Sequence, residues 1–117
     1  VLVLPRATSK SDPAWFGFPV TVREEAPFSR EDLTGFLYRK KIDTRLLFAG
    51  NVVRQPYFAG RTHRVAGNLD RTDVVLRRTF WLGVYPGLSE EMVAYVAEQV
   101  RAFVRDSVPP RACAVCR

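Results

Sequence analysis

The sequence has little of the residues from which metal and redox sites are built: one histidine and two cysteines among 117 residues. Cys113 and Cys116 have the spacing of half a zinc site or a redox pair, but His63 would still leave a closed zinc site one ligand short. A thioredoxin-like pair should open a helix, whereas this pair follows two prolines. We therefore predict no metal site and interpret the cysteine tail as unstructured.

Long hydrophobic runs are also missing. No segment approaches the roughly 20 apolar residues that span a bilayer, so we expect no membrane contact and a cytoplasmic location. The apolar start at residues 1–5 is too short for a signal peptide. The first residue is Val1 and not methionine, from which we expect a fragment or a processed product.

Basic residues outnumber acidic ones by 18 to 12, which gives a net charge of +6. Arg54, Arg61 and Arg64 could meet the phosphates of a nucleic acid. However, the arginines are scattered along the chain, and the aromatic–glycine pattern of RNA-binding modules is missing. We therefore predict no nucleic-acid partner, and a nucleotide diphosphate explains part of the basic surface equally well.

Hydrophobic periodicity and turn residues predict alternating strands and helices. The expected strands are 15–22, 44–49 and 79–85; the expected helices are 30–41, 69–78 and 90–105; a loop covers 55–67. This order predicts a small α+β domain with a two- or three-stranded sheet and two main helices. We expect 1–14 to be a connecting segment, 15–105 to be the domain and 106–117 to be a disordered tail.

Three local signals refine these elements. Ser29 with Asp32 three residues later predicts an N-cap for the first helix. Either Asn68 or Asp70 is expected to cap the second helix. Pro19 predicts an edge position or a bulge, because proline has no N–H for the strand ladder.

Catalytic motifs are missing from the sequence. It contains no G-x-S-x-G elbow, no phosphate-binding P-loop and no G-x-G-x-x-G fingerprint. The three lysines, Lys10, Lys40 and Lys41, lie in a predicted linker and at a helix end, so none is placed to form a Schiff base. His63 is interpreted as an exposed loop residue. We therefore expect this chain by itself to be inactive.

One segment, residues 42–56, combines a charged arginine with a hydrophobic strand and a Gly50–Asn51 break. Arg45 carries a fork of donors suited to carboxylate or phosphate. The other interpretation is structural, with Arg45 pairing with Asp43. From the residues alone, both interpretations stay open.

Several spaced motifs resemble a known family. They are W-F-G-F-P at 15–19, A-P-F-S-R at 26–30, T-R-L-L-F-A-G-N at 44–51 with R-Q-P at 54–56, and T-F-W-L-G-V-Y-P-G-L-S at 79–89. Together they resemble the C-terminal domain of the DegT/DnrJ/EryC/StrS sugar aminotransferases. Within that family they are most similar to the CDP-4-keto-6-deoxyglucose 3-dehydratases of lipopolysaccharide and dideoxysugar biosynthesis.

The resemblance implies the small domain of a type I pyridoxal-phosphate (PLP) enzyme, with a short, mostly antiparallel sheet. It also implies a homodimer that removes the 3-hydroxyl of a nucleotide-linked 4-keto-6-deoxysugar with PLP or its pyridoxamine form (PMP). The dehydratase branch further implies a [2Fe-2S] cluster and an electron-donating reductase. The ligands for both cofactors would lie outside this chain.

Four positions are carried over as substrate-binding candidates. Arg45 and Asn51 match family residues at the active-site cleft, Asp43 is a weaker candidate, and Gln55 is the weakest. Two alternatives remain: an aminotransferase of the same family, which would carry a catalytic lysine upstream where a dehydratase carries histidine, and a stand-alone interaction module.

Overall fold

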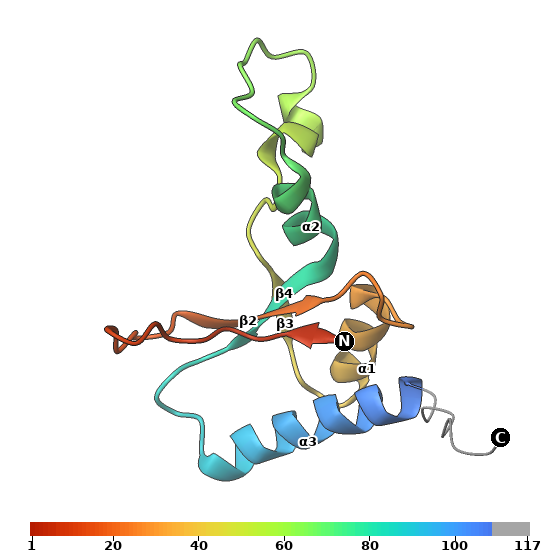
Figure 1. The fold of residues 1–117 in the computed structure, drawn as a ribbon. Coiled ribbons are helices and arrows are strands. Elements are labelled where there is room, and N and C mark those ends of the chain that lie inside the picture. The colour runs from red at the N-terminus through yellow and green to blue at the C-terminus, as the bar shows by residue number, and fades with distance from the viewer. Residues whose placement is uncertain (109–117) are drawn as a thin grey trace, which may run out of the picture.

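The computed structural model describes residues 1–108 and contains a four-stranded antiparallel sheet with three α-helices (Figure 1). The strands are β1 (Leu2–Val3), β2 (Gly17–Val22), β3 (Thr44–Leu46) and β4 (Thr79–Gly83), and their order in the sheet is β1-β2-β4-β3. The helices are α1 (Arg30–Arg39), α2 (Asp70–Arg78) and α3 (Glu90–Ser107). Two short 3-10 turns, η1 (Val52–Arg54) and η2 (Pro56–Phe58), lie between β3 and α2. The predicted α+β class is confirmed, with one strand more than expected.

The two faces of the sheet differ because successive side chains of a strand point to opposite sides. Val20 of β2 lies opposite Phe80 of β4, and both are buried. The next positions, Pro19 and Trp81, therefore point to the other side, where Arg45 of β3 is the partner of Trp81. We call the side that carries Pro19, Trp81 and Arg45 the outer face.

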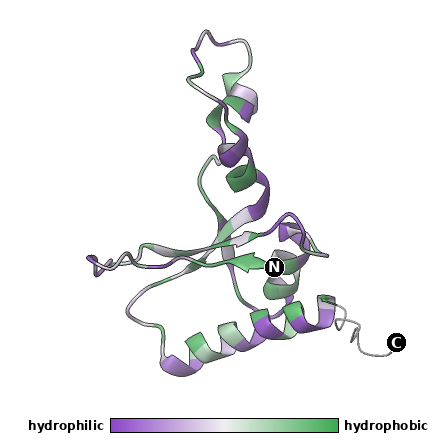
Figure 2. Ribbon diagram, viewed as in Figure 1, coloured by the Kyte–Doolittle hydropathy of each residue, from purple (hydrophilic) through white to green (hydrophobic). Residues whose placement is uncertain are grey.

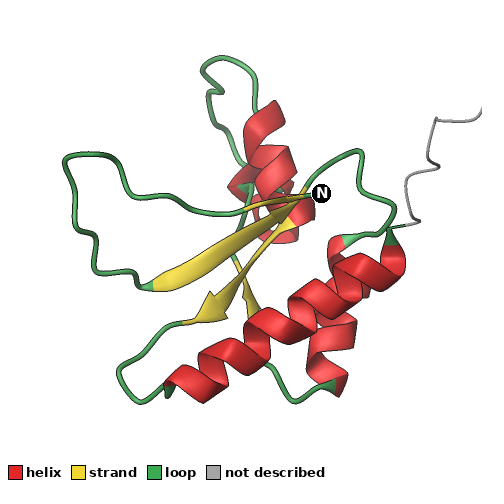
Figure 3. Ribbon diagram, turned by 60° about the horizontal axis from the view of Figure 1, so that its bottom comes forward, coloured by secondary structure: helices red, strands yellow, loops and turns green. Residues whose placement is uncertain are grey.

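The core lies between the inner face of the sheet and helices α1 and α3. Its buried hydrophobic residues are Val20, Val22, Phe28, Leu33, Leu37, Ile42 and Phe80. Helix α3 adds Phe103, whose ring meets Phe28 edge-on at 5.0 Å and lies 5.2 Å from Phe36. Hydrophobic and hydrophilic residues alternate along α3 (Figure 2), which packs beside α1 across the sheet (Figure 3).

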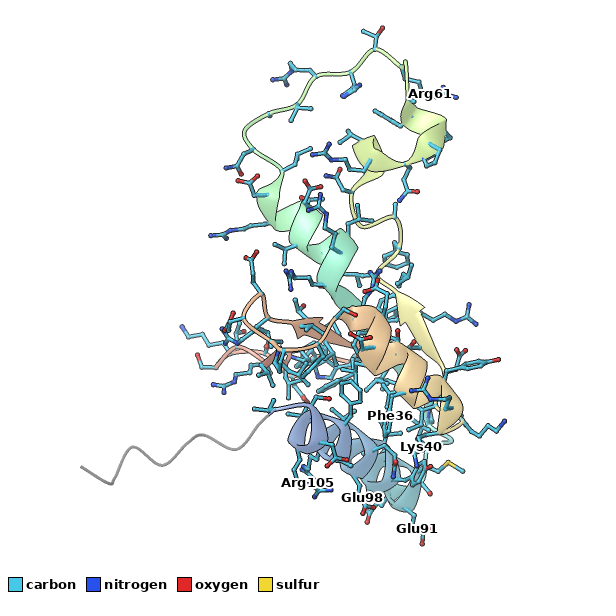
Figure 4. The ribbon with its side chains drawn as sticks, turned by 90° about the vertical axis from the view of Figure 1, so that its right-hand side faces the viewer. Phe36, Lys40, Arg61, Glu91, Glu98 and Arg105 are labelled. Atoms are coloured by element: carbon cyan, nitrogen blue, oxygen red, sulfur yellow. The ribbon has the colours of Figure 1, made fainter. Side chains whose placement is uncertain are left out.

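The polar side of α3 carries charges at a spacing of seven residues. Glu91, Glu98 and Arg105 lie along the side of the helix that faces away from the sheet (Figure 4). Residues seven apart return to the same side after about two turns, so this side is solvated. On α1, Phe36 faces α3, and Lys40 lies with its ammonium 5.6 Å from the Phe36 ring.

Pro19 was expected at an edge position or a bulge, and it lies at a position where β2 has no neighbour on one side. Strand β2 is internal to the sheet, but β1 pairs only with Thr21 and Val22. Pro19 lies beyond the end of β1, where β2 is locally an edge and no ladder bond on that side is lost.

The expected cap of α1 is confirmed. The Ser29 hydroxyl accepts the Asp32 N–H at 3.1 Å, and the Asp32 carboxylate accepts the Ser29 N–H at 2.8 Å. The expected side-chain cap of α2 is wrong: its N-cap is Leu69, which makes no side-chain capping bond. Asp70 instead occupies the first turn, where its charge still complements the helix dipole.

Two predicted boundaries need correction. Leu2 and Val3 form β1 against β2, so the segment 1–14 is not only a connection; a two-residue strand is too short to show periodicity. Helix α3 continues to Ser107, past the expected end at Arg105, and Cys113 and Cys116 lie outside the described residues. Within residues 1–108, no helix has the length and apolar character of a membrane span.

Candidate substrate-contact site

Arg45 lies on the outer face and is largely free of protein contacts. Its side chain is 80% exposed, and its one ion-pair partner among the described residues is Asp43, at 3.8 Å from Nε. Asp43 also accepts the Thr44 N–H at 2.9 Å, so its carboxylate faces the start of β3. An exposed pair at this distance contributes little to stability, which leaves the guanidinium free to bind a ligand.

An aromatic cluster lies beside Arg45 on the outer face. The Trp81 ring meets Phe16 at 5.2 Å and Phe48 at 4.9 Å, both edge-on. Gly17 makes this possible, since a Cβ at that position would lie 2.8 Å from the indole. Phe48 is 76% exposed and has a left-handed backbone, with a φ of 50°. The cluster gives Arg45 an apolar neighbourhood.

Asn51 is placed differently from Arg45. It is 1% exposed, and both halves of its amide have protein partners. Its Nδ2 donates to Asp73 Oδ1 at 2.6 Å, and its Oδ1 accepts the Val53 N–H at 3.2 Å. A substrate contact by Asn51 therefore stays a prediction, whereas its role in holding the chain after β3 is visible in the structure.

Asp73 is the partner that the sequence did not indicate. Its carboxylate accepts hydrogen bonds from Arg54, at 3.1 Å from Nη2, and from Asn51. These hydrogen bonds, first that of Arg54 and then that of Asn51, lower the pKa of Asp73 below its ordinary value, and the positive charges of Arg54 and Arg77 act in the same direction. The same contact raises the pKa of Arg54.

Gln55 closes the segment that Asn51 begins. Its Nε2 donates to the Ala49 carbonyl at 2.8 Å, so the side chain turns back along its own chain. The structure thus brings Gln55 and Asn51 together around residues 49–55, while Arg45 lies on β3 and Asp43 directly precedes that strand. Binding of substrate by Gln55 stays a prediction.

A hollow of about 490 Å³ lies between this segment and α2. Its lining residues are Leu47 to Val53, Arg64 to Ala66, Leu69, Thr72 and Val75. The lining is mainly apolar, and Arg64 supplies its charged side chain. A second hollow, of about 390 Å³, lies between the start of α1 and α2.

The described residues do not fit a PLP-binding set. Neither hollow is lined by a lysine, and Lys40 packs over Phe36 on α1. Residues 1–108 also bring together no group of three histidine, cysteine or carboxylate side chains that could hold a metal. What this site can do chemically is bind and orient an anionic or polar group at Arg45.

Residues 1–101 match the DegT/DnrJ/EryC1/StrS aminotransferase family. The chain belongs to this family. Among curated relatives in the family, the chain is 53% identical over 102 residues to "Lipopolysaccharide biosynthesis protein RfbH" of Salmonella typhimurium. It is 48% identical over 106 residues to "dTDP-4-dehydro-2,6-dideoxy-D-glucose 3-dehydratase" of Saccharopolyspora spinosa. These matches cover 87% and 91% of the chain but 23% of each relative, so the chain spans about a quarter of their length.

Solved family structures share the fold. The S. venezuelae DesV structure in complex with a ketimine intermediate superposes with a TM-score of 0.72 at 26% identity, over 88% of this chain and 26% of DesV. A DegT DnrJ EryC1 StrS aminotransferase from Brucella abortus gives the same TM-score at 18% identity, over 88% of this chain and 26% of that protein. At this identity the likeness shows the fold alone. The predicted family and the small-domain fold are therefore confirmed.

Proposed function

We propose that this chain is the C-terminal part of a nucleotide-sugar 3-dehydratase and that Arg45 binds an anionic or keto group of the substrate. The exposed guanidinium of Arg45 on the outer face carries this proposal, because its fork of donors has only the distant Asp43 as an ionic partner among residues 1–108. The 48% identity to a relative named as a 3-dehydratase supports the reaction type.

The chemistry at the sugar would be supplied by PLP or PMP, held by residues outside residues 1–108. Within this chain, Arg45 would orient the nucleotide sugar and Asp43 would limit the rotation of the guanidinium. The Trp81 cluster would exclude water beside the bound sugar. The homodimer, the [2Fe-2S] cluster and the reductase belong to the same proposal, and they rest on the family resemblance.

The reaction is tested with the full-length protein that contains this chain. CDP- and dTDP-linked 4-keto-deoxysugars are incubated with it, with PMP and a reductant, and products are identified by mass spectrometry. We expect the product that has lost the 3-hydroxyl. A product that gains an amino group from L-glutamate would instead identify an aminotransferase of the same family.

The role of Arg45 is tested in the same protein by Arg45→Ala. Loss of a charge-assisted contact to the substrate should raise KM by roughly ten- to a hundredfold, because such bonds contribute about 1.5–3 kcal/mol. Arg101→Ala on the exposed side of α3 is the matched control and should leave KM unchanged. An unchanged KM in Arg45→Ala would show that Arg45 does not contact the substrate.

A further inference from the structure

We propose that Asp73 is a positioning residue for Arg45: it acts through Asn51 and fixes the end of β3 from the side of α2. The inference rests on the proposed contact between Arg45 and the substrate. Asp73 lies on α2 and not on the outer face of the sheet, so its effect on substrate binding would be indirect.

Strand β3 has few hydrogen bonds of its own to hold it. It has three residues and pairs with β4 alone, on one side. Directly after it the chain turns sharply: the Phe48 N–H donates to the Leu46 carbonyl at 2.8 Å, and the Gly50 N–H donates to the Leu47 carbonyl at 3.0 Å. A short edge strand followed by a tight turn frays easily unless the turn is anchored elsewhere.

The turn also has a backbone that needs external support. Phe48 and Gly50 both lie in the left-handed region, with φ values of 50° and 61°. For Phe48 this conformation is costly, because its Cβ crowds the backbone, and it persists only where the surroundings hold it. The surroundings therefore have to specify this turn.

The anchor is one turn of α2, and it engages the segment in three ways. Asp73 accepts a hydrogen bond at 2.6 Å from the amide of Asn51, which is itself buried. The same carboxylate pairs with Arg54 at 3.1 Å. Gly50 packs so closely on α2 that an added Cβ would lie 2.6 Å from the Leu76 Cα.

The contacts of α2 with the turn also connect back to Arg45 through β4. Helix α2 ends at Arg78 and β4 begins at Thr79, so Asp73 is joined by continuous regular structure to Trp81. Trp81 is the partner of Arg45 in the β3–β4 ladder. The segment from Arg45 to Asn51 is thus held at its start by the β3–β4 pairing and at its end by the Asn51–Asp73 hydrogen bond. Breaking that bond frees the turn, and with it the position of the guanidinium and of the Phe48 ring.

The experiment uses the full-length protein and compares KM for the nucleotide sugar in single and double variants. Asp73→Ala removes both the Asn51 and the Arg54 contacts, and it should raise KM about tenfold while kcat changes less. Asp73→Asn keeps an Oδ1 acceptor for the Asn51 amide, so its KM should stay within about threefold of the unsubstituted protein. Asp70→Ala, one turn earlier on α2 and exposed, is the matched control and should leave KM unchanged.

The decisive comparison is made on an Arg45→Ala background. If Asp73 acts by positioning Arg45, Asp73→Ala should add little to the KM increase that Arg45→Ala already causes. A general loss of structure would multiply the two increases. Multiplicative effects, or an unchanged KM in the Asp73→Ala single variant, would overturn the inference.

Two further outcomes separate this inference from the proposed function. A normal KM in Arg45→Ala would remove the proposed contact between Arg45 and the substrate, whatever Asp73 does. A raised KM in Arg45→Ala with a normal KM in Asp73→Ala would remove only the positioning role. If Asp73→Ala does not fold, Asn51→Ser is used in its place with the same expected KM increase, which the Arg45→Ala background should again suppress.

Discussion

Arg45 of β3 and Trp81 of β4 are register partners on the outer face of the sheet, opposite the core. The partnership gives Arg45 an aromatic neighbour and a fixed strand position, while its side chain stays 80% exposed. A charged group held by the backbone but free at its tip is suited to contact a ligand. The site thus depends as much on the strand register as on the arginine.

Gly50→Ala is expected to destabilise the fold strongly. An alanine Cβ would meet the Leu76 backbone at 2.6 Å in addition to adopting a left-handed φ of 61°. The expected loss in the free energy of unfolding exceeds about 2 kcal/mol, since backbone strain alone costs about 1 kcal/mol or more. Gly60→Ala is the control, because Gly60 also has a positive φ but open space around it. Urea denaturation of the full-length proteins measures both, and equal losses would refute the packing argument.

Phe80→Ala and Phe48→Ala should differ sharply in stability. Phe80 is fully buried in the core on the inner face of the sheet, so its truncation should cost about 3–5 kcal/mol through lost burial and a cavity. Phe48 is mostly exposed, and its truncation should cost below about 1 kcal/mol. Thermal unfolding of the two variants tests this, and a larger loss for Phe48→Ala would show that another part of the protein buries its ring.

Ser29→Ala removes one half of the capping box of α1. The Asp32 N–H loses its acceptor at 3.1 Å, and the expected cost is about 1 kcal/mol. Thr34→Ala on the same helix is a suitable control, because its hydroxyl bonds only the Glu31 carbonyl at 3.3 Å. Chemical denaturation should show a lower midpoint for Ser29→Ala; equal midpoints would indicate that the cap is not needed.

Acidification should weaken the contact between α2 and the turn after β3. The pKa of Asp73 is lowered in the folded protein by its hydrogen bonds from Arg54 and Asn51, so folding favours the ionised carboxylate. Its contribution to stability is therefore present above the ordinary pKa of aspartate, about 3.9, and is lost as the pH falls through the lower folded value. Asp32, whose pKa is lowered by Ser29, acts in the same direction.

The measurement is the thermal midpoint as a function of pH between about 6 and 2. Asp73→Asn removes the titrating group and should flatten part of this dependence. Asp70→Asn is the control and should leave the dependence unchanged, because no hydrogen bond to the Asp70 side chain is seen within residues 1–108. Equal pH profiles for Asp73→Asn and the unsubstituted protein would contradict the assignment of the shift to Asp73.

Local signals explain which parts of the fold were predicted. The helix that begins after Ser29 carries its own capping box, and the one after Ser89 repeats its apolar residues at helical spacing, so neighbouring residues specify both. β1 was missed because two residues carry no period, and their pairing with Thr21 and Val22 depends on a segment far along the chain. The cap of α2 was assigned wrongly because both Asn68 and Asp70 are plausible caps by sequence.

The residues of the candidate site likewise fall into those that the sequence indicated and one that it did not. The family resemblance indicated Arg45 and Asn51 as substrate-binding candidates and ranked Asp43 and Gln55 behind them, whereas the residues alone left a structural role for Arg45 equally open. Asp73 was missed because it lies 22 residues from Asn51 and looks like an ordinary acidic residue in a helix. The one available signal was Asn51 itself, since an amide buried next to an apolar strand requires partners.

The sequence by itself determined the family, the α+β class and the two main helices, because these depend on motifs and on contacts within a few residues. Only the tertiary structure decided that Arg45 faces outward beside Trp81 while Asn51 turns inward to Asp73. That difference follows from strand alternation and from the packing of α2 on the turn after β3, which bring together residues that are distant in the chain.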